Sequence, residues 1–275
     1  MGELALIVFT LFMQGAIGAL AFVTIYSFMN KKGNFFLTYC VIAGLSIVAV
    51  LASLLHLGQP LGAMNSLLNM GNSWLSREIL FTGAFTALAF ALVILARTKI
   101  GGEKLTTIVS GVAVIVGLID VFCMAQIYMN TVIPAWASLN TLIDFLATTV
   151  ILGAAIFYLT AGKENLANKT AYIGWSAVAA AIIQVVSASI YFVGLSTGNG
   201  FAVETAMMLA QDFSIMLAVK WVLILAGAIL MALPTIKTFK NANVTLVAAV
   251  VAMIGLVVGR YIFYTAFVVE TIGIM

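Results

Sequence analysis

The chain has 275 residues, of which 64% are hydrophobic and only 8% are charged, and its mean hydropathy is +1.21. An average soluble domain is about 45–50% apolar and about 25% charged, so these few charges cannot cover a surface that faces water on all sides. The composition excludes a soluble globular protein and indicates an integral protein of a lipid bilayer, for which no nucleic-acid partner is expected.

Eight stretches are long and apolar enough to cross a bilayer, because about 20 apolar residues span a hydrocarbon core of about 30 Å. They are 4–29, 37–57, 79–96, 105–128, 141–161, 171–194, 215–234 and 244–269. The first stretch carries Glu3 and no basic leading region, so we expect a retained span and not a signal peptide. The prediction is an all-α, polytopic membrane protein with eight transmembrane helices and short loops, forming a single domain over residues 1–275.

Lysine and arginine residues gather in alternate connections between these spans. Nine of the twelve lie in four connections, as Lys31, Lys32, Arg97, Lys99, Lys104, Lys163, Lys169, Lys237 and Lys240. The connections 58–78, 129–140 and 195–214 hold only Arg77. Because cytoplasmic loops carry an excess of basic residues, the first set is predicted to be cytoplasmic and both termini are predicted to lie outside.

Small residues at Gly83/Ala87/Ala91 and Gly255/Gly259 are interpreted as helix-packing positions.

The connection between the second and third spans, 58–77, is predicted to be an outer loop with a short interfacial helix. Apolar residues recur there at helical spacing, at Leu61, Met64, Leu67 and Leu68. Pro60 ends the second span, and Ser76 is predicted to cap the third helix with Glu78 in its first turn.

The ionisable residues within or at the ends of the spans all fall in the predicted outer half. They are His56, Arg77, Glu78, Asp120, Asp144, Lys220 and Arg260. A proton or ion conductor needs polar groups through the full depth of the membrane, so this asymmetry disfavours a channel. Two interpretations stay open: a site that opens outward, or structural pairing of Lys220 and Arg260 with Asp120, Asp144 or Glu78.

His56 and Glu78 lie at facing ends of consecutive spans, which suggests a proton-accepting pair. Taken singly, His56 is compatible with an interfacial histidine and Glu78 with an acid that complements a helix dipole. Oxidation of a quinol needs an apolar slot and bases beside the ring hydroxyls, and histidine and glutamate suit that role. The chain has one histidine and two cysteines, too few for bis-histidine haem, a cubane iron–sulfur cluster or a usual zinc site. No metal site is therefore expected, and the electrons need an acceptor on a partner.

Residues 56–80, HLGQPLGAMNSLLNMGNSWLSREIL, resemble the membrane anchor subunits of dimethyl sulfoxide reductase. The likeness lies in His-Leu-Gly-x-Pro, Asn-Ser-Leu and Leu-Ser-x-Glu-Ile. The run GRYIFY at 259–264 and the segment Tyr128…Pro134-x-Trp136 are also similar to that family, and the resemblance extends over essentially the whole chain.

The resemblance implies a subunit that holds a ferredoxin-like iron–sulfur subunit, and through it a molybdopterin catalytic subunit, on the outer face of a prokaryotic plasma (inner) membrane. It implies that the subunit oxidises menaquinol to menaquinone in anaerobic respiration, without haem or an iron–sulfur cluster of its own. His56 and Glu78 correspond to the quinol site of the family, and Arg77, Lys220 and Arg260 are further candidates for binding the quinol. Lys220 stands near a position where the family carries arginine, which leaves the terminal acceptor open. The alternatives are a small-solute transporter or channel, and a purely structural anchor.

Overall fold

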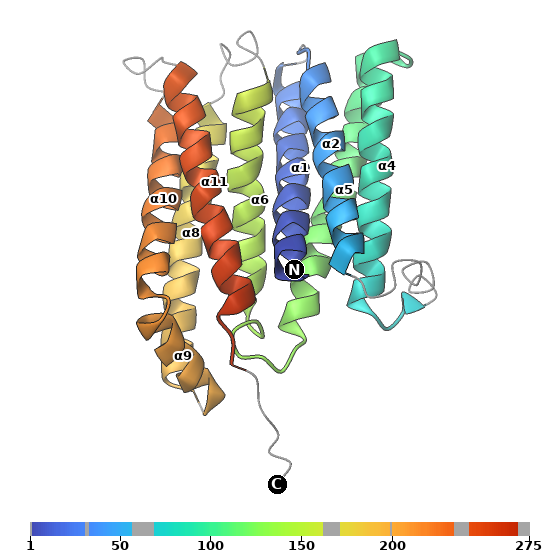
Figure 1. Cartoon of the computed structure of the whole chain (residues 1–275). Helices are drawn as coiled ribbons and strands as arrows, with labels where there is room; N and C mark the ends of the chain where they lie inside the picture. Colours follow the sequence, from blue (N-terminus) through green and yellow to red (C-terminus); the bar gives the residue numbers. More distant parts are fainter. Residues whose placement is uncertain are drawn as a thin grey trace.

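The computed structural model describes residues 2–30, 33–56, 69–161, 171–198, 200–233 and 242–268. In these ranges the regular structure is entirely helical, with nine α-helices (Figure 1). They are α1 (Gly2–Asn30), α2 (Phe36–His56), α4 (Trp74–Thr98), α5 (Gly102–Met129), α6 (Leu139–Thr160), α8 (Ala171–Ser196), α9 (Phe201–Gln211), α10 (Ser214–Ala232) and α11 (Ala242–Thr265). Eight of them are long and apolar enough to cross a membrane, which confirms the predicted all-α, eight-span fold.

The eight long helices form two groups of four that stand side by side (Figure 1). In the first group, α1, α2, α4 and α5 each pack against two neighbours within the group. In the second group, α6, α8, α10 and α11 do the same, and the short helix α9 packs against α8 and α10. The groups meet chiefly where α1 lies along α6.

Two glycines allow α1 and α6 to approach this closely. A Cβ atom added at Gly18 would collide with the carbonyl oxygen of Thr149 and would lie 2.9 Å from the Cα of Gly153. A Cβ at Gly153 would in turn collide with the backbone of Gly18. Because no side chain fits at either position, the crossing is a backbone-to-backbone contact of the kind that small residues permit between membrane helices.

The predicted packing role of glycines holds at α11 and fails at α4. A Cβ at Gly255 would lie 2.9 Å from the backbone nitrogen of Ile224 on α10, so Gly255 does serve close packing. Gly83 is exposed, and an added Cβ there would meet nothing within 4 Å. The prediction for Gly83 is therefore wrong, because no neighbouring helix among the described residues covers that face of α4.

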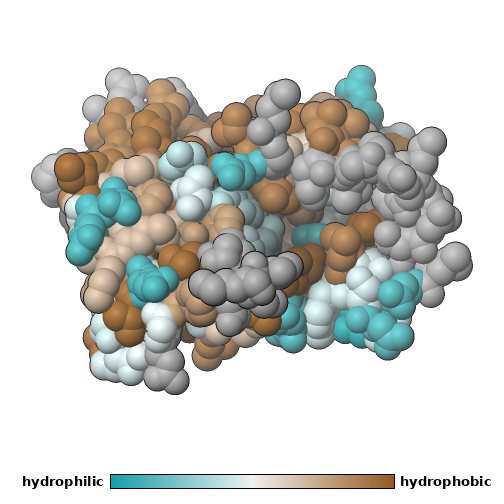
Figure 2. Space-filling model, turned by 60° about the horizontal axis from the view of Figure 1, so that its bottom comes forward, coloured by the Kyte–Doolittle hydropathy of each residue, from teal (hydrophilic) through white to brown (hydrophobic). Residues whose placement is uncertain are grey.

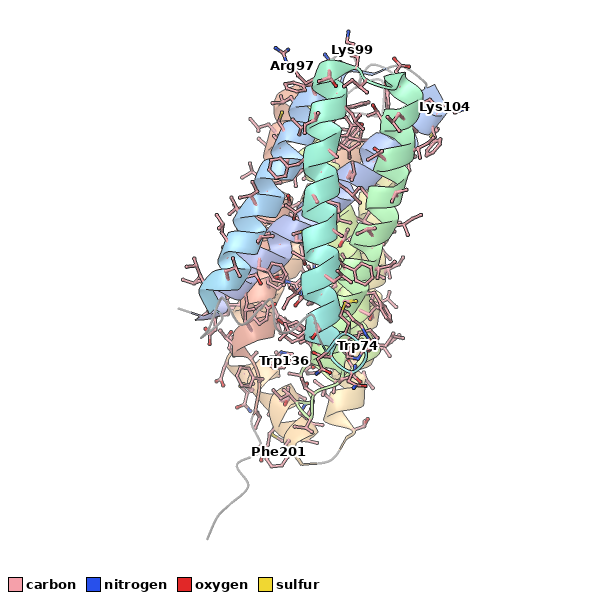
Figure 3. All side chains as sticks on the ribbon, turned by 90° about the vertical axis from the view of Figure 1, so that its right-hand side faces the viewer. Trp74, Arg97, Lys99, Lys104, Trp136 and Phe201 are labelled. Carbon is pink, nitrogen blue, oxygen red and sulfur yellow. The ribbon has the colours of Figure 1, made fainter. Side chains whose placement is uncertain are left out.

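The two ends of the molecule are called lower and upper, as they stand in Figure 1. The lower end holds the start of α1, the turn 69–73, the turn 130–138, helix α9 and the end of α11. The upper end holds the links 33–35 and 99–101; Arg97, Lys99 and Lys104 lie there, whereas Trp74, Trp136 and Phe201 lie at the lower end (Figure 3). Separate hydrophilic groups are set among hydrophobic side chains on the lower end (Figure 2). The lower end corresponds to the side that the basic residues predict to be outside.

One connection differs from the prediction, and another lies largely outside the described residues. The connection 195–214 contains the helix α9, which was not predicted from the sequence. The interfacial helix predicted within 58–77 rests on Leu61, Met64, Leu67 and Leu68, which lie outside the described residues. Residues 69–73, which are described, form turns before α4.

Candidate functional site

Helix α4 begins three residues earlier than the predicted cap would allow. Ser73 has an extended backbone (φ −117°, ψ 122°) and its side chain accepts a hydrogen bond from the backbone nitrogen of Ser76 at 3.3 Å. This is the geometry of an N-cap, so the assignment of that role to Ser76 is wrong. As a consequence Glu78 lies past the first turn, where it is buried against the protein instead of complementing the helix dipole.

Arg77 stabilises the turn that precedes α4. Its Nε donates to the carbonyl oxygen of Met70 at 2.9 Å, and its Nη2 donates to that of Gly71 at 2.6 Å. The guanidinium also lies over the ring of Trp74, 4.2 Å from the centroid. These contacts give Arg77 a structural role at the lower end of α4.

Glu78 belongs to a buried acidic pair in the first helix group, which we call the acidic pair and define as Glu78 and Asp120. Glu78 is 6% exposed, and Asp120 on α5 is fully buried. The Thr82 hydroxyl lies 3.0 Å from both carboxyl oxygens of Asp120, to which it can donate. The two carboxyl groups interact electrostatically, and among the described residues neither forms an ion pair. Buried carboxyl groups without a cation are expensive in a membrane and mark a functional site.

His56 is the last residue of α2, and α2 packs against α4. The end of α2 and the start of α4 both lie at the lower end, so the backbone brings His56 and Glu78 to the same end of neighbouring helices (Figure 1). The side chain of His56 is outside the described structure. The pairing of His56 with Glu78 therefore stays a prediction.

Lys220 and Arg260 converge on Asp144 in the second helix group. Lys220 Nζ lies 3.4 Å from Asp144 Oδ1, and Arg260 Nη2 lies 3.9 Å from Asp144 Oδ2. Gln184 Nε2 donates to Asp144 Oδ1 at 2.6 Å, and Arg260 Nη2 donates to Gln14 Oε1 at 2.9 Å. We call these five residues the charge cluster; they come from five different helices. Of the three acids that the sequence left open as partners, all of them described, the structure pairs Lys220 and Arg260 with Asp144 alone.

Two tyrosine hydroxyls connect the helix groups beside these sites. Tyr128 on α5 and Tyr264 on α11 have their hydroxyl oxygens 2.9 Å apart. Both tyrosines interact electrostatically with Glu78 and with Arg260. Arg260 is itself stacked over the ring of Phe145, 4.0 Å from the centroid. The hydroxyl pair thus joins α5 of the first helix group to α11 of the second.

Sequence reasoning missed several members of this network. Gln14 is a polar residue in the middle of the long apolar helix α1. A polar side chain in such a position indicates an interhelical hydrogen bond. Thr82 carries no comparable signal, because threonine hydroxyls in helices often bond to their own backbone. Tyr264 ends the GRYIFY run, which was used only for the family resemblance. Each charged residue of both sites lies nearer the lower than the upper end of its helix, as the sequence predicted.

Comparison with known proteins identifies the family. Residues 1–266 match the family model described as the DMSO reductase anchor subunit (DmsC). The protein belongs to the DMSO reductase anchor subunit family. It is 27% identical to the C subunit of the anaerobic dimethyl sulfoxide reductase of Haemophilus influenzae, over 95% of this sequence and 94% of the relative. It is 28% identical to the corresponding C subunit of Escherichia coli K12, over 79% and 76% of the two sequences. It is also 28% identical to YnfH of E. coli K12, which is named as part of an anaerobic dimethyl sulfoxide reductase, over 95% and 94%. No solved structure gives a significant match.

One residue of each site falls on a segment through which the sequence resembles this anchor family. The Leu-Ser-x-Glu-Ile run places Glu78 on α4, and the GRYIFY run places Arg260 and Tyr264 on α11. Membership of the anchor family and eight apolar helices make this a multi-pass membrane protein.

Proposed function

We propose that the protein anchors a DMSO reductase-like complex in the prokaryotic plasma membrane and oxidises menaquinol for it in anaerobic respiration. The family, and relatives that are named as parts of anaerobic dimethyl sulfoxide reductases, support the anchoring role. The partners are a ferredoxin-like iron–sulfur subunit and a molybdopterin catalytic subunit, both bound at the lower end.

The observation that carries the quinol proposal is the burial of Glu78 at the lower end without a cation among the described residues. A carboxyl group in this setting can take a proton and so become neutral, whereas a carboxylate held by a lysine or arginine is stabilised in its charged form. Asp120 adjoins Glu78 and is equally without a described cation. The acidic pair therefore offers bases in an apolar surrounding, which is what a quinol ring requires.

The proposed reaction converts menaquinol to menaquinone with the loss of two protons and two electrons. Glu78 and His56 accept the protons from the two ring hydroxyls and release them at the lower end. The electrons pass one at a time to an iron–sulfur cluster of the partner subunit, because one histidine and two cysteines are too few to build a haem or cubane centre here. Protons and electrons leave on the same side, so turnover alone creates no membrane potential.

Arg77 has an indirect, positioning role in the proposed site. Its guanidinium is already bonded to the carbonyl groups of Met70 and Gly71. It holds the turn that starts α4 and so positions Glu78 along its helix. This makes it a positioning residue, and its own charge is not needed for proton transfer.

The test compares His56→Ala combined with Glu78→Gln against Glu204→Gln in the assembled complex. Glu204 is an exposed glutamate of α9 at the same end of the molecule, so it is a matched control for loss of one carboxylate. We expect the double variant to lower menaquinol-dependent turnover by about 100-fold or more, the usual range for losing a general base. Activity with a soluble viologen donor, which bypasses the quinol, should be unchanged in both variants.

Normal menaquinol turnover in the double variant contradicts the proposal and leaves a purely structural anchor. Solute uptake by vesicles that contain the protein without its partners supports a transporter instead. Loss of viologen-driven activity shows that the substitutions disrupt assembly; Glu78→Gln alone, which keeps the shape of the side chain, then decides the question.

A further inference from the structure

A cavity of about 420 Å³ lies between the helices of the second group, near the lower end. Its walls come from α6, α8, α10 and α11, with Leu209 of α9 and Ala135 of the 130–138 turn at the margin. Helix α9 is fastened at this place by an apolar cluster formed by Leu195, Ala206, Leu209, Ile262 and Ala266. The cavity is thus bordered by packed apolar side chains beside α9, whereas Ser189, Phe192 and Val193 of α8, which also line it, are exposed.

Two charged side chains line the cavity at one place, which we call its polar end, and most of the other lining residues are apolar. The polar end presents Asp144 and Lys220, whose side chains are 15% and 11% exposed. Arg260 does not line the cavity, and its side chain is 1% exposed. The apolar walls include Ala188, Phe192, Leu217, Ile262 and Phe263. An occupant would therefore meet one ammonium and one carboxylate, the polar groups of Asn140, Thr141, Ser189 and Tyr191, and otherwise aliphatic and aromatic side chains.

The hydrogen-bonding capacity of this polar end is incompletely used. A lysine ammonium has three donors, and one described hydrogen bond joins Lys220 Nζ to Asp144 at 3.4 Å. The ammonium also lies 4.4 Å from the centroid of the Trp221 ring, another cavity residue. Asp144 retains acceptor capacity on its exposed side. The head of the cavity can therefore donate to an oxygen acceptor and accept from a hydroxyl at neighbouring points.

These features select the class of occupant. The two charged groups that line the cavity, Lys220 and Asp144, cancel each other, so a neutral head with both an oxygen acceptor and a hydroxyl donor matches them. Aromatic and aliphatic walls suit a flat ring followed by a hydrocarbon tail. The volume falls within the range of about 300–1,000 Å³ that is typical of small-molecule sites.

We infer that this cavity is a second binding site for an isoprenoid quinone or quinol. Lys220 donates to one ring oxygen, and Asp144 accepts from the ring hydroxyl of the reduced form. The inference takes the identity of the ligand from the proposed function, but its site is a different one. Neither Glu78 nor Asp120 lines the cavity, and both belong to the first helix group.

The experiment is equilibrium dialysis of a short-chain menaquinone against the full-length protein, isolated in detergent with its co-purifying subunits. Ala188→Trp fills the cavity from α8, and Ala179→Trp is the matched control, since Ala179 is exposed on the same helix and does not line the cavity. We expect two quinones per complex in the wild type and in Ala179→Trp, and one in Ala188→Trp. Lys220→Met, which leaves Asp144 with Arg260, should weaken the affected site about tenfold, equal to about 1.4 kcal/mol.

The same titration separates this inference from the proposed function. A quinone lost in His56→Ala/Glu78→Gln and a different one lost in Ala188→Trp support both. A single quinone that survives Ala188→Trp and disappears with Glu78 overturns the second site only. A single quinone that survives the Glu78 variant and disappears in Ala188→Trp supports the cavity and contradicts the site at Glu78. Phospholipid in place of quinone in the wild-type cavity overturns the inference.

Discussion

The acidic pair and the charge cluster bury the same kind of carboxyl group at the same end of the molecule, yet their surroundings are opposite. Asp144 stands between Lys220 and Arg260 and accepts a hydrogen bond from Gln184. Asp120 accepts a hydrogen bond from the Thr82 hydroxyl and interacts with a second acid, Glu78, and no cation among the described residues pairs with it. A carboxylate between two cations stabilises the packing of the second helix group, whereas a carboxyl group without a cation can exchange a proton, which is the role proposed for the acidic pair.

The largest effect is expected when the charge cluster loses its carboxylate. Asp144→Asn keeps the shape of the side chain but leaves Lys220 and Arg260 without a counter-charge in the membrane interior. We expect the unfolding free energy to fall by about 3–5 kcal/mol, as when one partner of a buried ion pair is removed. Thermal unfolding of the purified protein in detergent measures it, with Asp212→Asn as the control because Asp212 is exposed beside α9. Equal melting temperatures for the two variants would show that the cluster contributes nothing to the fold.

The position of the charges along the membrane normal was predictable, whereas their pairing was not. Depth follows from counting residues along an apolar stretch, and this placed Glu78, Asp120, Asp144, Lys220 and Arg260 in one half of the bundle. Pairing depends on the rotation of each helix about its axis and on which helices are neighbours. Both are set by contacts such as Gly18 against Gly153, which join segments far apart in sequence.

The two errors in the connections, at the cap of α4 and at helix α9, have local causes. Ser73 and Ser76 are equally good capping residues by type. In the structure Ser73 has the extended backbone of a cap, and the next residue, Trp74, packs its ring against Phe122 on α5. Helix α9 had a readable signal, since Phe201, Thr205 and Leu209 recur on one helical face. The sequence interpretation treated 195–214 as a connection because the stretch is too polar and too short to cross a membrane.

An intermediate effect is expected at the hydroxyl pair that joins the two helix groups. Tyr264→Phe removes one hydroxyl and leaves that of Tyr128 without this partner. We expect a loss of about 1–3 kcal/mol in unfolding free energy, the usual penalty for an unsatisfied buried polar group. If the hydroxyl pair is coupled to the charge cluster, combining Tyr264→Phe with Asp144→Asn will cost measurably more or less than the sum of the single losses, as a double-mutant cycle of melting curves will show. Strict additivity would mean that the hydroxyl pair and the charge cluster are energetically independent.

The smallest effect, with the opposite sign, is expected at Asp120. Asp120→Asn removes a buried charge that has no cation among the described residues, while the amide oxygen can still accept from the Thr82 hydroxyl. The cost of burying the charge disappears and the hydrogen bond remains, so the unfolding free energy should stay equal or rise by up to about 1 kcal/mol. The measurement is the melting curve used for Asp144→Asn, recorded side by side with it. A loss as large as that of Asp144→Asn would mean that Asp120 is held by a cation after all, and the contrast between an unpaired and a paired carboxyl group would fail. A gain, together with slower menaquinol oxidation, would mean that the acid is kept for its proton at the expense of stability.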